Sequence, residues 1–275
     1  MAESNVPAAS GAQTPVGAIP RSSEPALRLT GVSKAFGAVQ ALKDVDFEVW
    51  GGEVVGLVGD NGAGKSTLIK IIAGVNPGDS GHIYLAGKEV QINAPGDATR
   101  LGIETVYQDL ALADNLDVVA NLYLGREDVA PRVPALGGVL NELEMEQRTL
   151  GVLRQLDVRT IKSVRTPVAA LSGGQRQSIA VAKTILRNPK VVLLDEPTAA
   201  LGVAQTRQVL NLIRRLRDRG LAVVVISHNL ADVFEVVDRV IVLRLGRRVG
   251  SYDVRNTTPE QVVSAITGAE FGEVE

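Results

Sequence analysis

Four things are scarce or missing in this chain of 275 residues, and each of them excludes a class of function. The chain has no cysteine, which excludes a disulfide framework, thiolate zinc sites and cysteine catalysis. Aromatic residues make up only 3%, which argues against a platform for stacking bases. Neither sign of charge dominates, since 31 acidic residues balance 29 basic ones, so the chain as a whole is not drawn to nucleic acid.

Long apolar runs are also missing. The longest, such as 221–226, are far shorter than the ~20 residues that a membrane-spanning helix needs. Residues 1–25 are rich in Ala, Ser, Pro and Gly, without a basic start or an apolar block, so we predict a disordered leader and not a secretory signal. The rest, 26–275, predicts one large cytoplasmic domain, unless a partner holds it at a membrane.

The order of predicted elements indicates an α/β fold. In the second half a strand at 191–194, a helix at 204–219 and a strand at 221–226 alternate, which predicts a parallel sheet with helices on its faces. The first half is richer in strands, which we predict at 27–32, 45–49, 53–58, 82–85, 89–92 and 103–107.

The segment from 109 to about 170 has a mostly helical pattern. Asn141 caps a predicted helix, with Glu144 three positions on. Leu143, Leu150 and Leu153 are predicted to share the buried face of that helix.

Residues 59–66 predict a phosphate-binding loop. Their sequence, GDNGAGKS, fits the pattern G-x-x-x-x-G-K-[ST] and lies between a predicted strand and a predicted helix. The glycines allow backbone N–H groups to converge on an anion, and the helix N-terminus adds its positive dipole end. Lys65 offers a positive charge to the β- and γ-phosphates of a nucleotide, and Ser66 offers a hydroxyl to Mg²⁺.

Two carboxylates follow the apolar strand at 191–194. Ligands of α/β sheets bind beyond the carboxyl ends of the strands, so Asp195 is placed to hold Mg²⁺ directly or through water. Glu196 can polarise an attacking water as a general base. Acids also cap buried strands without any chemistry, but the phosphate loop in the same chain favours the catalytic interpretation.

A second anion site is predicted at 171–175, LSGGQ, where a helix over 175–186 begins. Ser172 and Gln175 have the spacing of a capping box, which is a structural role. Gly173 and Gly174 cost stability at a helix start, which indicates that something approaches the backbone closely.

With these motifs in this order, the sequence resembles the ATP-binding subunits of ABC transporters over about residues 27–268. LSGGQ matches the family's signature motif, Gln108 its Q-loop glutamine and His228 its switch histidine. Phe36, in KAFG, matches the position at which the family stacks an aromatic ring on adenine. Alone, these three residues would indicate strand caps and a core side chain, whereas the intact motif order favours function.

The resemblance implies a fold and a set of site residues. The fold is a P-loop NTPase core with a parallel sheet, an antiparallel β subdomain and a helical subdomain at about 109–170. The implied catalytic residues are Glu196, His228 and Gln108. The implied nucleotide-binding residues are Phe36, Gly59, Asn61, Gly62, Gly64, Lys65, Ser66 and Thr67. The implied metal-binding residues are Ser66, Gln108 and Asp195, and the cofactors are ATP and Mg²⁺.

In this family the signature of one subunit completes the phosphate site of another. Ser172, Gly173, Gly174 and Gln175 would therefore act across a homodimer, or across a pair with a similar subunit, that buries two ATP molecules. The resemblance also implies an integral membrane permease docked near the helical region after Gln108, a solute-binding protein as an indirect partner, and no nucleic acid. The chain would then lie peripherally at the cytoplasmic face of the inner (plasma) membrane.

Gly202 departs from the usual family pattern, which has an acid after Ala-Leu, so the cross-dimer contact of that acid is not implied. The branch that imports monosaccharides is similar at this point and often reads EPTAALG, as residues 196–202 do. We therefore predict an ATPase that powers import of a small solute, a monosaccharide, through a separate permease.

Two other hypotheses remain open. A soluble ABC-type ATPase acting on nucleic acid or ribosomes would generally carry two ATPase units or a long coiled-coil insertion, and this sequence indicates neither. A non-catalytic nucleotide-binding module would not need Lys65, Asp195, Glu196 and His228 together. The basic stretch at 214–219 is interpreted as a solvated helix end, and His82 as a surface residue.

Overall fold

Two sheets of different kinds organise the chain. The structure is a computed structural model that describes residues 23–129 and 138–269, so most of the predicted leader lies outside the described residues. An antiparallel sheet has the strand order β2-β1-β4-β5, and a six-stranded sheet has the order β10-β9-β3-β8-β7-β6. The second sheet is parallel except for its edge strand β10, which runs antiparallel to β9.

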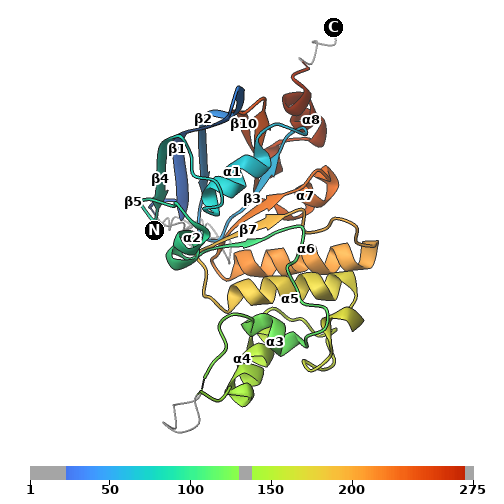
Figure 1. The fold of residues 1–275 in the computed structure, drawn as a ribbon. Helices are drawn as coiled ribbons and strands as arrows, with labels where there is room; N and C mark the ends of the chain where they lie inside the picture. The colour runs from blue at the N-terminus through green and yellow to red at the C-terminus, as the bar shows by residue number, and fades with distance from the viewer. Residues whose placement is uncertain (1–22, 130–137, 270–275) are drawn as a thin grey trace, which may run out of the picture.

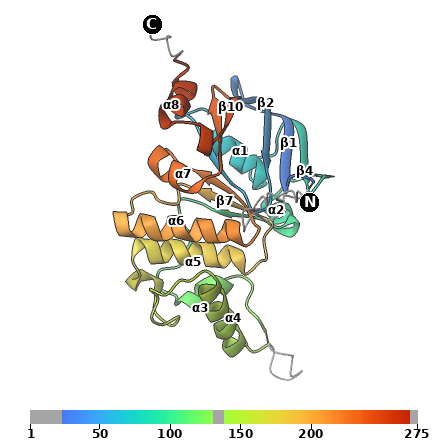
Figure 2. The same cartoon turned by 180° about the vertical axis from the view of Figure 1, so that it is seen from behind.

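The strands are β1 (Leu27–Phe36), β2 (Val39–Val49), β3 (Val54–Val58), β4 (Ser80–Leu85), β5 (Lys88–Val90), β6 (Ile103–Val106), β7 (Val191–Asp195), β8 (Ala222–Ile226), β9 (Arg239–Arg244) and β10 (Arg247–Asp253). The helices are α1 (Lys65–Ile72), α2 (Pro95–Leu101), α3 (Val118–Tyr123), α4 (Glu142–Gln155), α5 (Gly173–Ile185), α6 (Val203–Asp218), α7 (Leu230–Val236) and α8 (Pro259–Thr267). In Figure 1 the antiparallel sheet lies above α2, α5 and α6 lie below the six-stranded sheet, and α3 and α4 lie lowest. Figure 2 shows the same tiers from behind.

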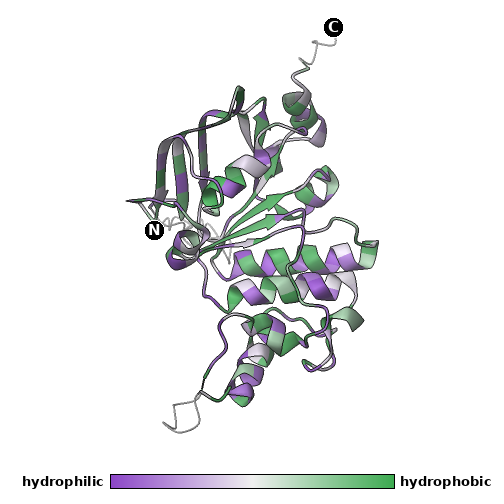
Figure 3. Ribbon diagram, in the orientation of Figure 1, coloured by the Kyte–Doolittle hydropathy of each residue, from purple (hydrophilic) through white to green (hydrophobic). Residues whose placement is uncertain are grey.

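The central strands are apolar along their whole length because both faces of the parallel sheet are covered. Val55 and Leu57 of β3 belong to one core, whereas Val54 and Val58 belong to the other. Figure 3 shows these strands as continuously hydrophobic, whereas the helices below them carry a hydrophobic and a hydrophilic face. The predicted parallel sheet with helices on its faces is confirmed.

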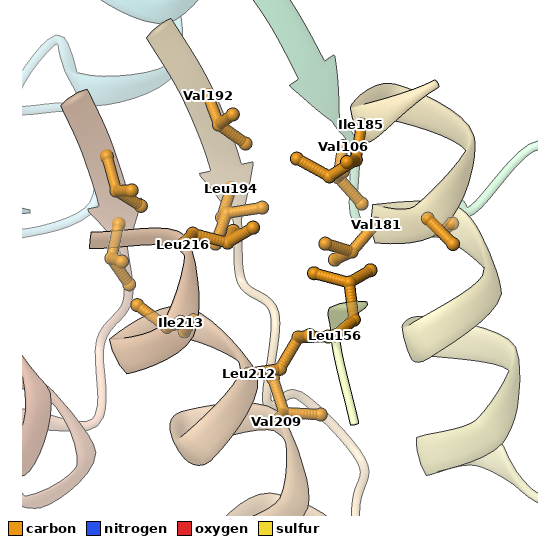
Figure 4. Packing of buried hydrophobic residues seen from close by; sticks show 14 of the residues in the cluster. Val106, Leu156, Val181, Ile185, Val192, Leu194, Val209, Leu212, Ile213 and Leu216 are labelled. Carbon is orange, nitrogen blue, oxygen red and sulfur yellow. The ribbon is translucent and has the colours of Figure 1, made fainter. Parts of the chain in front are cut away.

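The two cores place the helices on opposite sides of the six-stranded sheet. The first core joins the antiparallel sheet, α1 and one sheet face. The second core joins the other face to α5 and α6. In Figure 4, Leu194 of β7 lies next to Leu216 of α6, and Val181 of α5 belongs to the same cluster. Helices α1 and α5 therefore lie on opposite sides of the six-stranded sheet.

In its described residues, the segment after β6 is less helical than predicted. These residues hold α3, α4 and a short 3-10 turn at Val168–Ala170. The predicted cap of α4 is confirmed, because the Asn141 side chain accepts a hydrogen bond from the backbone N–H of Glu144.

The predicted buried face of α4 is partly wrong. Leu153 is buried, but Leu143 and Leu150 are 69% and 40% exposed. The face that packs inward is the row of Met145, Thr149 and Val152, on the opposite side of the helix from Leu143. Helix α4 packs on α3 and α5, and the position of those helices decides which side is buried.

The basic end of α6 is not simply solvated, as the sequence had indicated. Arg214 pairs with Glu235 of α7 at 2.8 Å, and Arg215 pairs with Asp157 after α4 at 2.5 Å. Arg217 lies 3.4 Å from Asp238, the residue that precedes β9. These arginines tie α6 to three other parts of the chain. No sequence pattern indicated helices α2 and α7.

Candidate active site

Four neighbouring strands of the parallel sheet end at the same edge, and each carries a predicted site residue. The spatial order β3-β8-β7-β6 places Gly59 after β3, His228 after β8, Asp195 and Glu196 at the end of β7, and Gln108 after β6. Carboxyl ends of parallel strands meet at one edge of a sheet, which is where ligands of such folds bind. The sheet thus brings together residues that lie far apart in the sequence.

The predicted phosphate loop has a backbone that requires glycine. Gly59 has φ +152° and Gly64 has φ +105°. A Cβ on Gly59 would lie 2.2 Å from the carbonyl oxygen of Leu243, and one on Gly64 would lie 2.8 Å from that of Ala41. Strands β9 and β2 therefore hold the loop from behind. Helix α1, which follows it, has neither a capping side chain nor an acid in its first turn, so its N-terminal N–H groups suit an outside anion.

Two substitutions separate the effect of a steric clash in this loop from the effect of a positive φ alone. Gly59→Ala is expected to destabilise the protein by about 2 kcal/mol or more and to displace the loop, because the new Cβ would clash with a backbone oxygen. Gly62→Ala is expected to cost only about 1 kcal/mol, because φ is +79° but no atom lies within 4 Å. Thermal unfolding together with ATP titration measures both effects, and equal losses in the two variants would contradict this account.

Lys65 is folded over its own loop. Its Nζ donates hydrogen bonds to the carbonyl oxygens of Gly59 at 2.8 Å and Asp60 at 2.9 Å. Burial lowers the pKa of the Lys65 amine, while Glu196, Asp60 and Asp195 oppose the shift. The ammonium group is thus held at the helix N-terminus and within the field of the strand-end acids.

The remaining predicted nucleotide residues lie in or near the loop. Asn61 and Ser66 are exposed and Thr67 is half-buried. The backbone N–H of Asn61 donates to the Asp60 carboxylate at 2.8 Å, which fixes the turn. Phe36 is the last residue of β1 and is 48% exposed, with the Lys34 ammonium 5.6 Å from its ring centre. An exposed ring at a strand end is available for stacking and is not a core residue.

The carboxylate pair lies in two different environments. Burial raises the pKa of Asp195, and the nearby Glu196 adds to the shift, while Lys70 and Lys65 oppose it. Glu196 has φ +48°, a backbone conformation that non-glycine residues rarely adopt. Such strain persists only where the surroundings hold it, and here the Glu196 N–H donates to the Ile226 carbonyl at 2.9 Å.

Glu196 and His228 meet across the ends of β7 and β8. The Nδ1 of His228 lies 2.9 Å from Oε2 of Glu196, with 16% of the Glu196 side chain and 77% of the His228 side chain exposed. This contact has the distance of an ion pair but not hydrogen-bond geometry, and among the described residues Oε2 is left without a hydrogen-bond partner. A buried carboxylate oxygen without a donor is costly, and a bound water molecule would satisfy it.

The predicted second anion site, at the start of α5, is surrounded by other residues than the phosphate loop is. The Ser172 hydroxyl accepts a hydrogen bond from the Gln175 N–H, and the Gln175 side chain accepts one from the Ser172 N–H at 2.9 Å. These two bonds confirm the capping box. A Cβ on Gly173 would lie 2.9 Å from Cδ2 of Leu201, and one on Gly174 would lie 3.1 Å from Cβ of Gln205. What approaches these glycines within the chain is therefore Leu201, just before α6, and Gln205 in its first turn, and a Cβ at either glycine would press on those side chains.

Comparison with protein families matches residues 42–199 to the ABC transporter family, a stretch that runs from before the phosphate loop to beyond the carboxylate pair. The chain belongs to the ABC transporter family. Membership confirms the predicted resemblance, the fold class and the class of activity, which is that of an ATP-binding ATPase.

Curated relatives of this ABC ATPase include a fructose import ATP-binding protein of Rhizobium meliloti. It is 45% identical over 90% of this chain and 95% of the relative. A xylose/arabinose import ATP-binding protein of Sulfolobus acidocaldarius is 44% identical over 90% of this chain and 96% of the relative. A ribose import ATP-binding protein of Yersinia pestis is 39% identical over 91% of this chain, which spans only 48% of that relative.

Solved structures share the fold. An ATP-binding cassette of an ABC transporter in its ADP conformation has a TM-score of 0.74 and 25% identity, and the match covers 90% of this chain and 96% of that one. A dimeric post-hydrolysis state of an ATP-binding cassette bound to ADP and Pi has a TM-score of 0.67 and 26% identity. That match covers 84% of this chain and all of the other.

Two residues that position His228 in this ABC ATPase were not predicted from the sequence. Ser227 is buried, and its hydroxyl accepts a hydrogen bond from the Asn229 N–H at 3.1 Å. Asn229 in turn caps α7 through the N–H groups of Ala231 and Asp232. The signal was the cluster of polar capping residues directly after a buried strand, which is typical of a helix start.

None of the helices in the described ranges combines the length and the apolarity that crossing a bilayer requires.

Proposed function

We propose that this chain is the ATP-hydrolysing subunit of an importer for a small solute, a monosaccharide. The observation that carries the catalytic part is the buried Oε2 of Glu196, which lacks a hydrogen-bond partner among the described residues and lies at the strand edge that carries the phosphate loop. The import part rests on the relatives, since the three named above import fructose, xylose or arabinose, and ribose.

ATP binding falls to the phosphate loop and to the exposed ring of Phe36. The N–H groups at the start of α1 and the Lys65 ammonium would hold the β- and γ-phosphates once Lys65 leaves the two carbonyl oxygens that it now contacts. Phe36 would stack on the adenine. Ser66 and Thr67, in the first turn of α1, would add hydroxyl contacts to the phosphates.

Hydrolysis requires a water molecule in line with the γ-phosphate and a group that takes its proton. Glu196 would accept that proton on Oε2, the atom left without a donor. His228 would orient the carboxylate from 2.9 Å and donate to a γ-phosphate oxygen. Gln108, which is exposed after β6, would lie at the same edge of the sheet, beside the attacking water.

Mg²⁺ fits the donor set at this edge. Ser66, Asp195 and Gln108 offer a hydroxyl, a carboxylate and an amide oxygen, which are the hard ligands that this ion prefers. Burial raises the pKa of Asp195, and a cation would offset that cost. The described ranges hold no group of three or more His, Cys, Asp or Glu residues suited to a metal, so phosphate and water would complete the shell. Bound there, Mg²⁺ neutralises charge on the transferring phosphate.

A dimer would complete the site. Helices α1 and α5 cover opposite sheet faces, and no hydrogen bond or ion pair joins Ser172 to the phosphate loop among the described residues. In a two-fold pair, Ser172, Gly173, Gly174 and Gln175 of each chain would face the nucleotide of its mate. The dimeric cassette bound to ADP and Pi is a precedent for such an assembly. A membrane permease and, through it, a solute-binding protein would be the other partners, and the subunit would lie peripherally at the cytoplasmic face of the inner membrane.

The dimer is tested by its dependence on ATP. In a chain carrying Glu196→Gln, ATP is expected to convert monomers to dimers in size-exclusion chromatography with light scattering. Adding Ser172→Glu is expected to abolish the dimer, because a carboxylate would face the γ-phosphate, while binding of a fluorescent ATP analogue to the monomer persists. The control is Ser163→Glu, an exposed position. Dimers that survive Ser172→Glu would contradict the composite site.

A further inference from the structure

The ring of Phe36 lies on a part of β1 that extends beyond one of its two neighbouring strands. β1 lies between β2 and β4 (Figure 1), and among the described residues its pairing with β4 ends at Ser33, opposite Ser80. From Lys34 to Phe36 it continues to pair with β2, and the register shifts on both sides of Lys34. The segment that carries the ring therefore lies outside the regular part of the antiparallel sheet.

Asp79 takes the place of β4 along this segment. It directly precedes β4, and its own N–H donates to the Ser33 carbonyl at 2.9 Å. Its Oδ2 accepts the Ala35 N–H at 2.7 Å, and its Oδ1 accepts a hydrogen bond from Lys34 Nζ at 2.6 Å. The hydrogen bond from Lys34 and that from the Ala35 N–H lower the pKa of Asp79, so the carboxylate stays charged at neutral pH. One side chain thus fixes the two residues before Phe36.

Lys34 connects this carboxylate to the ring. Its Nζ lies 5.6 Å from the centre of the Phe36 ring, and only 16% of the Lys34 side chain is exposed, whereas Phe36 is 48% exposed. Holding a long lysine side chain in one position costs conformational entropy, and the hydrogen bond to Asp79 offsets that cost. A cation is attracted to the face of an aromatic ring. The ammonium group can therefore hold the ring while its exposed part stays open to a base.

Asp79 is also tied to the helix that follows the phosphate loop. Residues 73–79 join α1 to β4, and the Val75 N–H fixes this connection to α1 by donating to the Lys70 carbonyl at 2.8 Å. The phosphate loop precedes α1 directly. One short stretch of chain thus joins the residues that would bind the phosphates to the carboxylate that holds the ring segment.

We propose that Asp79 is a positioning residue for nucleotide binding: its contacts with Lys34 and Ala35 set the orientation in which the Phe36 ring meets the base of ATP. This role rests on the proposed function, because it presupposes that Phe36 stacks on adenine. It divides ATP binding into a base part, which depends on Asp79, and a phosphate part, which does not.

The test compares a nucleotide with a probe that has no base. Affinities of the full chain for ADP and for inorganic pyrophosphate are measured by isothermal titration calorimetry with Mg²⁺ present. Asp79→Ala and Lys34→Met are each expected to weaken ADP binding about threefold to tenfold, because the ring loses the orientation needed for stacking. Pyrophosphate binding is expected to stay unchanged, since both variants leave the phosphate loop intact. Lys34→Arg, which keeps a cation beside the ring, is expected to bind ADP as the wild type does.

The matched control is Asp97→Ala on α2. Like Asp79, Asp97 accepts hydrogen bonds from backbone N–H groups, those of Asn93 at 3.0 Å and Ala94 at 2.9 Å, and it pairs with Arg100. Its removal is expected to lower the Tm, because it removes a helix cap, and to leave the affinities for ADP and pyrophosphate unchanged. A loss of ADP affinity in Asp79→Ala alone therefore does not follow from lowered stability.

Two further measurements separate positioning from a structural role. In steady-state hydrolysis, Asp79→Ala is expected to raise the KM for ATP with kcat unchanged, because the base is bound equally in the ground state and the transition state. Phe36→Ala alone is expected to weaken ADP binding about tenfold, and in that background Asp79→Ala is expected to cause no further loss, since its effect passes through the ring.

Equal weakening of ADP and pyrophosphate binding in Asp79→Ala, or a further loss in the Phe36→Ala background, would show a general effect on the fold and overturn the proposal. Unchanged ADP binding in Asp79→Ala, where Phe36→Ala weakens it, would overturn the proposal while leaving the proposed function intact. If Phe36→Ala bound ADP as tightly as the wild type, the proposed stacking would be wrong, and Asp79 would have no ring to position. Failure of the wild-type chain to bind ADP or hydrolyse ATP would instead count against the proposed function.

Discussion

Glu196→Gln is expected to reduce ATP turnover by about 10²–10⁴-fold while ATP still binds, because it removes the proton acceptor and leaves the phosphate loop intact. The amide has the shape of the carboxylate, so it fits the same strained backbone at φ +48°. The buried oxygen without a donor, Oε2, is the atom on which the effect depends. Phosphate release under single-turnover conditions measures the rate, and titration with a fluorescent ATP analogue measures affinity.

The matched control is Glu260→Gln, which removes a carboxylate from the exposed start of α8. Its turnover is expected to equal that of the wild type. Near-normal turnover in Glu196→Gln would show that another group takes the proton. Loss of ATP binding together with turnover would assign Glu196 a structural role instead.

Lys65→Ala is expected to weaken ATP binding by about tenfold to a hundredfold, because it removes charge-assisted hydrogen bonds worth about 1.5–3 kcal/mol. The lysine is held close to its target: its Nζ lies 2.8 Å from the Gly59 carbonyl oxygen at the N-terminus of α1. Equilibrium binding in the Glu196→Gln background isolates affinity from turnover. The control is Lys88→Ala on β5, an exposed lysine of the antiparallel sheet.

An unchanged dissociation constant for Lys65→Ala would mean that the backbone N–H groups of the loop bind the phosphates alone. That outcome would leave Gly59 and Gly64 as the essential positions. Comparison with Gly59→Ala therefore tells whether the loop acts mainly through its backbone or through its charge.

The comparisons favour the importer over the nucleic-acid hypothesis, since the relatives named above are import proteins. The basic stretch near the end of α6 is moreover neutralised in part, since Arg214, Arg215 and Arg217 are paired with Glu235, Asp157 and Asp238.

Local features of this protein could be predicted from the sequence because they depend on neighbours a few residues away. The phosphate loop needs glycines at fixed positions within residues 59–66, and the caps at Asn141 and Ser172 need a partner three residues on. The apolar strands of the parallel sheet could also be predicted from the sequence, because strands that are buried on both faces form continuous apolar runs. These features determined the fold class and most of the candidate site.

The orientation of α4 could not be predicted in the same way. Leu143 and Met145 are both apolar and both lie near the start of the helix, yet the first is exposed and the second is buried. The choice depends on where α3 and α5 lie, which is not encoded within the helix itself. Gly173 and Gly174 are a related case: the sequence indicated a close approach but not that α6 makes it.

By itself, then, the sequence determined the motifs, the alternation of strands and helices, and the family. Only the tertiary structure decided which motifs meet. The strand order β3-β8-β7-β6 differs from the chain order, and it brings Glu196 within 2.9 Å of His228, while α1 and α5 pack on opposite faces of the sheet. It likewise pairs Arg187, which follows α5, with Glu104 of β6 at 2.8 Å. The physical reason is that strand pairing and helix packing depend on contacts between distant segments, and charge balance and burial at a site are properties of those contacts.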